Sequence, residues 1–188
     1  MTDYVFYTAS TLDGFLADEN DSLDWLLTQP IDEDGPHNIA DLMAATGAIV
    51  MGSTTYRWVV DHITASGEEW MYKDHPTFVF THRDLEPVHP SITVVAGSPA
   101  EHRAALEKAA GDRAVWVVGG GDLAAQFAED GMLDELLVSF APATVGSGRP
   151  LFPRAWDFEL LETVQNKAFV IARYRVVGPR GQAASPVG

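Results

Sequence analysis

The chain has 188 residues, of which 46% are hydrophobic and 21% charged, a composition typical of one globular domain and too apolar for a disordered chain. Its 27 acidic and 12 basic residues give a net charge of −15, which disfavours binding to nucleic acid or anionic membranes. The absence of cysteine excludes disulfides, thiolate metal sites and thiol nucleophiles. With no leader pattern at its amino terminus and no segment of membrane-spanning length, the chain is expected to be cytoplasmic.

Strands alternate with helices along most of the chain. Apolar and β-branched runs predict strands over residues 4–10, 48–51, 77–80, 92–95, 114–118, 132–140, 158–164 and 168–177. Helices are predicted over residues 36–45, from Ser53 onward, over 98–110 and over 123–130. This order predicts one three-layer α/β/α domain over residues 1–178, with a mostly parallel central sheet and a C-terminal antiparallel hairpin. Residues 179–188 are rich in Gly, Pro, Ala and Ser and are predicted to be a disordered tail.

The most informative stretch is a buried strand, a glycine turn and a helix start over residues 114–127. Gly119, Gly120 and Gly121 remove every Cβ at the turn, so backbone N–H groups and the positive helix end can approach a phosphate. Gly52 and Ser53 repeat this design after the strand at 48–51. Each turn alone is equally well explained as a tight connection, with Ser53 or Thr54 capping a surface helix.

Three stretches with possible ligand-binding groups fall at the carboxyl ends of predicted parallel strands. They are the turn at Gly52, the donor cluster Thr81-His82-Arg83 and the turn at Gly119. Ligands of such sheets bind outside the carboxyl ends of the strands, so the fold places the three along one crevice. Their convergence favours a nucleotide site over three unrelated turns.

Two loops supply candidates for the substrate side. Residues 18–34 form an acidic segment with an apolar island around Trp25, which resembles a lid, and Asp24 beside that indole is the candidate proton donor. A second glycine-rich loop over residues 142–153 could grip an anion through Arg149. The alternative for Asp24 is a solvated loop acid. The six histidines lack metal-ligand spacing, so no metal is expected.

Four stretches resemble the dihydrofolate reductase superfamily, in particular the reductase domain of the riboflavin-pathway deaminase-reductase. The stretches that carry the resemblance are residues 12–17, 49–56, 117–127 and 141–148. The resemblance implies a dihydrofolate reductase-like fold, NADPH as cofactor and a homodimer. It also implies a cis peptide bond between Gly119 and Gly120. The cofactor-binding residues that it implies are Ala9, Leu16, Ala17, Gly52, Ser53, Thr54, Thr55, Thr81, His82, Arg83, Gly119, Gly120, Gly121, Asp122 and Leu123.

The substrate side departs from the family patterns. Pro36 stands where dihydrofolate reductases carry an acid, which disfavours a folate, and Val117-Val118 replaces an acid common in the riboflavin-pathway reductases. The candidate substrate residues are Trp25, Arg57, Gly146 and Arg149. The expected activity is an NADPH-dependent reduction of a small heterocyclic or ribosyl-linked substrate, of the 5-amino-6-(5-phosphoribosylamino)uracil reductase type. A nucleotide-binding or regulatory homologue without turnover, a pterin or dihydrofolate reductase, and NADH in place of NADPH remain alternatives.

Overall fold

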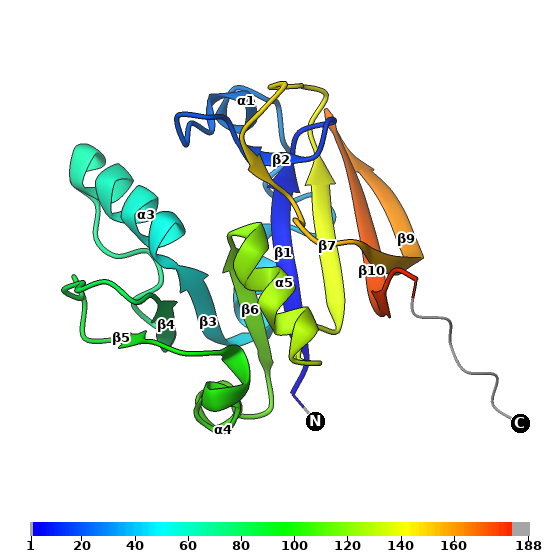
Figure 1. Cartoon of the computed structure of the whole chain (residues 1–188). Coiled ribbons are helices and arrows are strands. Elements are labelled where there is room, and N and C mark those ends of the chain that lie inside the picture. The colour runs from blue at the N-terminus through cyan, green and yellow to red at the C-terminus, as the bar shows by residue number, and fades with distance from the viewer. Residues whose placement is uncertain (1, 182–188) are drawn as a thin grey trace, which may run out of the picture.

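The computed structural model describes residues 2–181 and consists of a twisted sheet with helices on both faces (Figure 1). Its strands follow the order β5-β4-β3-β6-β1-β7-β10-β9 in the main sheet, and β2 pairs with β8 in a separate ribbon. The strands are β1 (Tyr4–Ser10), β2 (Phe15–Ala17), β3 (Thr46–Gly52), β4 (Thr77–Phe80), β5 (Ile92–Val95), β6 (Ala114–Gly119), β7 (Glu135–Phe140), β8 (Arg149–Pro150), β9 (Trp156–Asn166) and β10 (Phe169–Pro179). The helices are α1 (Asp24–Leu27), α2 (Ile39–Ala45), α3 (Ser53–Ser66), α4 (Pro99–Ala110) and α5 (Gly121–Glu129).

The strands from β5 to β7 all run parallel, and β10 then reverses the direction. The predicted mostly parallel sheet with a C-terminal antiparallel hairpin is therefore confirmed. β10 pairs with β7 on one side and with β9 on the other, and β9 is the edge strand. In Figure 1 the arrowheads of β1, β3 and β7 point to the same end of the molecule, where α1 and the β2–β8 ribbon also lie.

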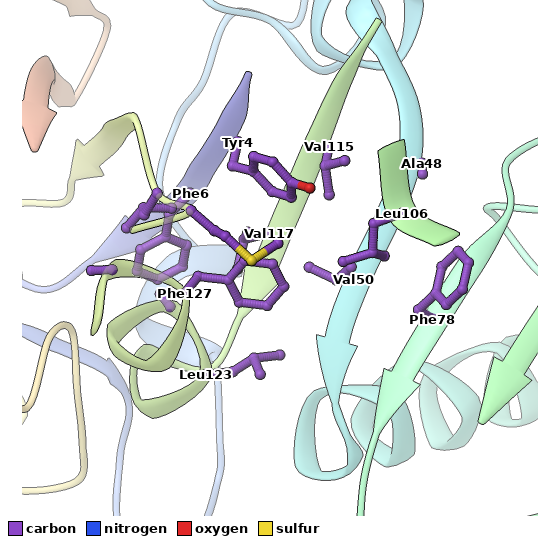
Figure 2. Packing of buried hydrophobic residues seen from close by; sticks show 14 of the residues in the cluster. Tyr4, Phe6, Ala48, Val50, Phe78, Leu106, Val115, Val117, Leu123 and Phe127 are labelled. Carbon is purple, nitrogen blue, oxygen red and sulfur yellow. The ribbon is translucent and has the colours of Figure 1, made fainter. Parts of the chain in front are cut away.

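Alternate side chains of the central strands pack on opposite faces of the sheet. Ala48 and Val50 of β3 join the cluster under α4 and α5, whereas Ile49 and Met51 join the cluster under α3. Figure 2 shows the first cluster, in which Phe127 of α5 lies among side chains of the central strands. The fully buried run in β3 fits its position between two layers of helices, since a parallel strand covered on both faces has no solvent side.

Several element boundaries differ from the predicted ones. The predicted helix over 36–45 begins only at Ile39, because Asn38 adopts an extended conformation and accepts a hydrogen bond from the backbone N–H of Asp41. The helix predicted from Ser53 onward continues to Ser66 and ends at Gly67 in the left-handed conformation. The acidic segment contains the short helix α1, which was not predicted.

The end of the chain also differs from the prediction. Pro179, assigned to the tail, is the last residue of β10, and the backbone N–H of Arg180 donates to the carbonyl of Ala155 at 3.0 Å. The remainder of the predicted tail, residues 182–188, lies outside the described residues. Within residues 2–181, no helix is both long and apolar enough to span a membrane.

Candidate active site at the carboxyl ends of the parallel strands

A cavity of about 840 Å³ opens at the carboxyl ends of the central strands. Gly52 at the end of β3, Thr81 after β4 and Gly119 at the end of β6 all line it, as the convergence of the three stretches predicted. Such a volume lies in the upper range of small-molecule sites. Its position is where open α/β sheets bind their ligands.

Two helices present N-termini without side-chain caps to this cavity. α3 begins after Gly52 and α5 begins after Gly120, and neither capping residue has a side chain that could accept a hydrogen bond from the helix. By contrast, Asn38 caps α2, and α4 has a capping box in which the Ser98 N–H donates to Glu101 at 3.2 Å. The uncapped N–H groups and the positive ends of α3 and α5 are suited to bind an anion in the cavity.

The glycine turn before α5 is required by close packing as well as by access to the cavity. A Cβ on Gly121 would collide with the carbonyl oxygens of Pro150 and Leu151, so the backbone of β8 lies directly against the start of α5. Gly119 has a φ of +137°, and the peptide bond between Gly119 and Gly120 is cis, as the resemblance implied. A Cβ on Gly120 would meet no atom within 4 Å, so this turn leaves open space in front of the helix.

One end of the cavity lies beyond β4. Thr81 accepts a hydrogen bond from the backbone N–H of Arg83 at 3.0 Å, which fixes the turn that follows the strand. Thr81 and His82 line the cavity, whereas Arg83 is exposed and does not. Of this cluster, Thr81 and His82 are therefore the residues in a position to contact a ligand.

The part of the cavity beside β1 is mostly apolar and aromatic. Ala9, Leu16 and Ala17 line it, and all three are among the cofactor-binding residues that the resemblance implies. The floor includes Tyr7 and Trp116, and the indole N–H of Trp116 donates to the Tyr7 carbonyl at 3.0 Å. This hydrogen bond positions the indole of Trp116, whose ring also contacts the Tyr7 ring edge-on with centroids 6.3 Å apart.

Two tyrosines of this lining stay protonated well above neutral pH. Burial raises the pKa of Tyr72 to about 12, and burial also raises the pKa of Tyr7. The Tyr7 hydroxyl donates to the backbone carbonyl of His37 at 2.8 Å. Both rings are therefore neutral polar groups rather than sources of charge.

An ion pair spans the mouth of the same region. The Arg149 side chain of β8 donates to both carboxylate oxygens of Asp21, with N–O distances of 2.6 and 2.9 Å. Hydrogen bonds and charge from Arg149 lower the pKa of Asp21, so the pair is ionised at neutral pH. Both residues line the cavity, so the structure brings Arg149 to the site but pairs it with a carboxylate of the acidic segment.

Five predicted residues lie outside the cavity lining. They are Asp24, Trp25, Arg57, Arg83 and Gly146. Asp24 borders a separate hollow of about 250 Å³, and Trp25 packs in the cluster formed by Phe169 and Ile171. Arg57 is exposed on α3, and the Gly146 N–H donates to the Asp13 carboxylate at 2.8 Å. None of the five has a contact in the structure that supports its predicted role.

Other residues of the lining were missed. The Tyr7 position could have been inferred from Ala9, because residues two apart on a strand share a face. Trp58 could have been inferred from Thr54 one helical turn earlier. The sequence carries no comparable signal for Tyr72, which reaches the cavity from the segment after α3.

The described part of the chain, residues 2–181, holds no group of three or more His, Asp or Glu residues positioned to bind a metal ion. The described site combines backbone N–H groups, polar and aromatic side chains, and the Asp21–Arg149 ion pair. These features define a class of protein: an α/β domain with a cavity of about 840 Å³ and two uncapped helix N-termini at the carboxyl edge of its sheet.

Residues 4–168 match the family described as RibD C-terminal domain, and the chain belongs to this family. Among curated proteins it is similar to "Uncharacterized protein YwjB" of Bacillus subtilis. The two are 28% identical over 148 residues, which cover 79% of this chain and 81% of the relative.

The solved structures confirm the dihydrofolate reductase-like fold. A putative riboflavin biosynthesis protein from Shewanella sp. PV-4 superposes with a TM-score of 0.76 at 24% identity, covering 94% of this chain and 99% of that one. The Thermotoga maritima diaminohydroxyphosphoribosylaminopyrimidine deaminase/5-amino-6-(5-phosphoribosylamino)uracil reductase gives 0.66 at 15%, covering 94% and 57%. Dihydrofolate reductase from Enterococcus faecalis, complexed with NADP(H) and RAB-propyl, gives 0.58 at 14%, covering 93% and 96%.

Proposed function

We propose that this protein is an NADPH-dependent reductase that transfers a hydride to a small heterocyclic substrate. The observation that carries the proposal is the pair of uncapped helix N-termini, at Ser53 and Gly121, which face one cavity. A dinucleotide has a central pyrophosphate, and two helix ends with free N–H groups can neutralise its charges where the net charge of −15 opposes binding. The family and the fold support the same class of activity.

The residues present fit this cofactor. The backbone N–H groups at the starts of α3 and α5 would hold its phosphates, and Thr81 and His82 would contact the adenosine end. Ala9, Leu16 and Ala17 would border the nicotinamide, which supplies the hydride when bound. The apolar side chains there exclude water and orient the two rings, and hydride transfer needs little more from a protein.

The experiment that tests the proposal is a titration of the intact protein with NADPH, followed by tryptophan fluorescence. Trp58 and Trp116 line the cavity, so a bound reduced nicotinamide should quench them, with an affinity in the micromolar range. A parallel titration with NADH measures the preference between the two cofactors. An unchanged signal up to millimolar NADPH would remove the proposal.

The alternative is a homologue that binds the nucleotide without turnover, and the observation that favours it is the position of Asp24 outside the cavity. Loss of the reduced-nicotinamide absorbance in the presence of pterins, flavins and aminopyrimidines distinguishes the two. Cofactor binding without reduction of any of them would favour the alternative. The cytoplasmic location and the homodimer remain predictions of the sequence and the resemblance.

A further inference from the structure

The cavity carries few positive groups for the substrate of the proposed reductase. Within the described residues its lining holds one arginine, Arg149, and one histidine, His82. His82 follows β4, which lies three positions from β1 in the sheet order, so it belongs to the far end of the cavity. Arg149 is therefore the cation available to a charged group bound beside β1.

Arg149 is already neutralised by a group of the protein. Asp21 accepts two hydrogen bonds from the guanidinium, in the bidentate geometry that a phosphate would also use. A phosphate bound to the same two nitrogens would have to displace Asp21, and one bound to the remaining Nη1 would lie beside that carboxylate. The Arg149 and Asp21 side chains are 57% and 38% exposed, so displacing Asp21 costs little, and the main penalty is the repulsion between the phosphate and the carboxylate.

In the glycine-rich loop over residues 142–153, backbone N–H groups that could bind an anion are likewise occupied by a carboxylate of the chain. The backbone N–H groups of Val145 and Gly146 donate to the Asp13 carboxylate, at 3.2 and 2.8 Å. Thr11 donates to the same carboxylate through its hydroxyl at 2.6 Å. The two features that could hold a phosphate near β1 each bind an aspartate of this chain instead.

The remaining lining of this half suits a flat, uncharged ring. Its apolar and aromatic residues are Leu23, Leu26, Trp58, Tyr72, Trp116 and Phe169. Ser139, Thr8 and Tyr7 add neutral hydroxyl groups to the same lining. Aromatic and aliphatic walls with a few polar groups are the usual surroundings of neutral heterocycles.

We infer that the substrate of this protein is an uncharged planar heterocycle without a phosphate group, and that the Asp21–Arg149 pair excludes phosphate esters. The inference rests on the proposed function. A phosphoribosylated pyrimidine bound beside β1 would find no unpaired cation in the described lining of that part of the cavity.

Two pairs of probes that differ by a phosphate test the inference: riboflavin with riboflavin 5′-phosphate, and uridine with uridine 5′-phosphate. Each is titrated calorimetrically into the protein, with and without saturating NADPH. The neutral member of at least one pair should bind at least tenfold more tightly than its phosphate ester. Equal or tighter binding of the esters, or no binding of either neutral probe, would overturn the inference.

Two variants show whether the ion pair causes the preference. Asp21→Asn frees Arg149 and should tighten binding of the phosphate ester at least tenfold, with little change for the neutral probe. Glu19→Gln removes the same charge from an exposed position in the same segment and should leave both affinities unchanged. Equal effects of the two substitutions would contradict a role for the pair.

The cofactor titration keeps the two proposals apart. If the protein binds NADPH but prefers the phosphate esters, the proposed function is supported and the inference about the substrate is wrong. If the protein fails to bind NADPH but prefers the neutral probes, the proposed cofactor is wrong, whereas the exclusion of phosphate esters is supported.

Discussion

Single positions of the cavity wall are set by the distance between backbones. The carbonyl oxygens of Pro150 and Leu151 occupy the space where a side chain of residue 121 would begin, so only glycine fits between β8 and α5. This contact joins the β2–β8 ribbon to one of the two helix ends that would bind the cofactor. Its loss should therefore change both stability and binding.

We expect Gly121→Ala to lower the free energy of unfolding by about 1–3 kcal/mol, the usual cost of overpacking a tight site. The NADPH affinity should fall as well, because β8 or the start of α5 must move. Gly178→Ala is the matched control, since a Cβ there meets no atom within 4 Å and its φ is ordinary. The control should stay within about 0.5 kcal/mol of the wild type in urea denaturation. Equal stability of the two variants would contradict the packing account.

At the scale of elements, the loop from Ala141 to Gly148 is joined to the turn between β1 and β2 by the carboxylate of Asp13 as well as by backbone hydrogen bonds. Asp13, in the turn between β1 and β2, accepts hydrogen bonds from Thr11, Val145 and Gly146. The Thr11 hydroxyl, followed by the backbone N–H groups of the loop, lowers the pKa of Asp13 below its ordinary value of 3.8. The ionised carboxylate is therefore the form that ties the turn to the loop.

Asp13→Asn should destabilise the protein by an amount that depends on pH. Because the folded pKa of Asp13 lies below the unfolded one, its stabilisation is fully present above pH 3.8 and is lost as the pH falls through the folded pKa. The difference in unfolding free energy between wild type and variant should thus be constant from pH 7 to 5 and shrink in stronger acid. Asp112→Asn, at an exposed acid, controls for the change in net charge. If the difference in unfolding free energy grew as the pH fell, the ionised carboxylate of Asp13 would not be the stabilising form.

The element pattern was predictable where it depends on buried strands and glycine turns. The runs before Gly52 and Gly119 identify strands covered on both faces, and the turns after them identify the cavity edge. The short helix α1 and the strand β8 were not predicted, because neither has a length or a periodicity that differs from a loop. Their positions depend on tertiary contacts such as the Asp21–Arg149 pair.

The two halves of the site differ in how far the sequence predicts them. The proposed phosphate sites at Gly52 and Gly120 depend on backbone N–H groups, whose geometry glycine turns indicate directly. The other half depends on side chains from separate elements, such as Tyr7, Trp58 and Tyr72. Arg149 is the clearest example of what the sequence cannot predict. The sequence indicated a cation near a glycine-rich loop, but it did not indicate that Asp21 neutralises that cation.

On the scale of the whole molecule, the C-terminal hairpin leaves apolar side chains exposed at the edge of the sheet. They are Leu160, Leu161, Val170 and Val177 on β9 and β10. Such a surface on an edge hairpin is suited to contact a second copy, which agrees with the homodimer that the resemblance implies.

Light scattering with gel filtration at micromolar concentration should therefore give about twice the chain mass of 20.4 kDa. Leu160→Glu should shift the protein toward the monomer, because it buries a charge in the proposed contact. Val88→Glu, at a similarly exposed apolar residue away from the hairpin, should not. A monomer mass for the wild type would overturn the proposed dimer.

Because of the net charge of the molecule, binding of an anionic cofactor would depend on the two helix ends. At −15, the chain repels a polyanionic cofactor, so binding must come from a few local donors rather than from the overall field. A carboxylate placed at one of these ends would occupy the proposed phosphate position. It would also cap the helix, which separates an effect on binding from an effect on folding.

The decisive measurement is the NADPH affinity of Gly52→Asp compared with Gly52→Asn. A Cβ at this position meets its nearest atoms at 3.9 Å, so either side chain fits, and both are good N-caps for α3. We predict that both variants keep the stability of the wild type and that Gly52→Asp binds NADPH at least tenfold more weakly than Gly52→Asn. Equal affinities in the two folded variants would show that no phosphate lies at the start of α3, and would contradict the proposed site.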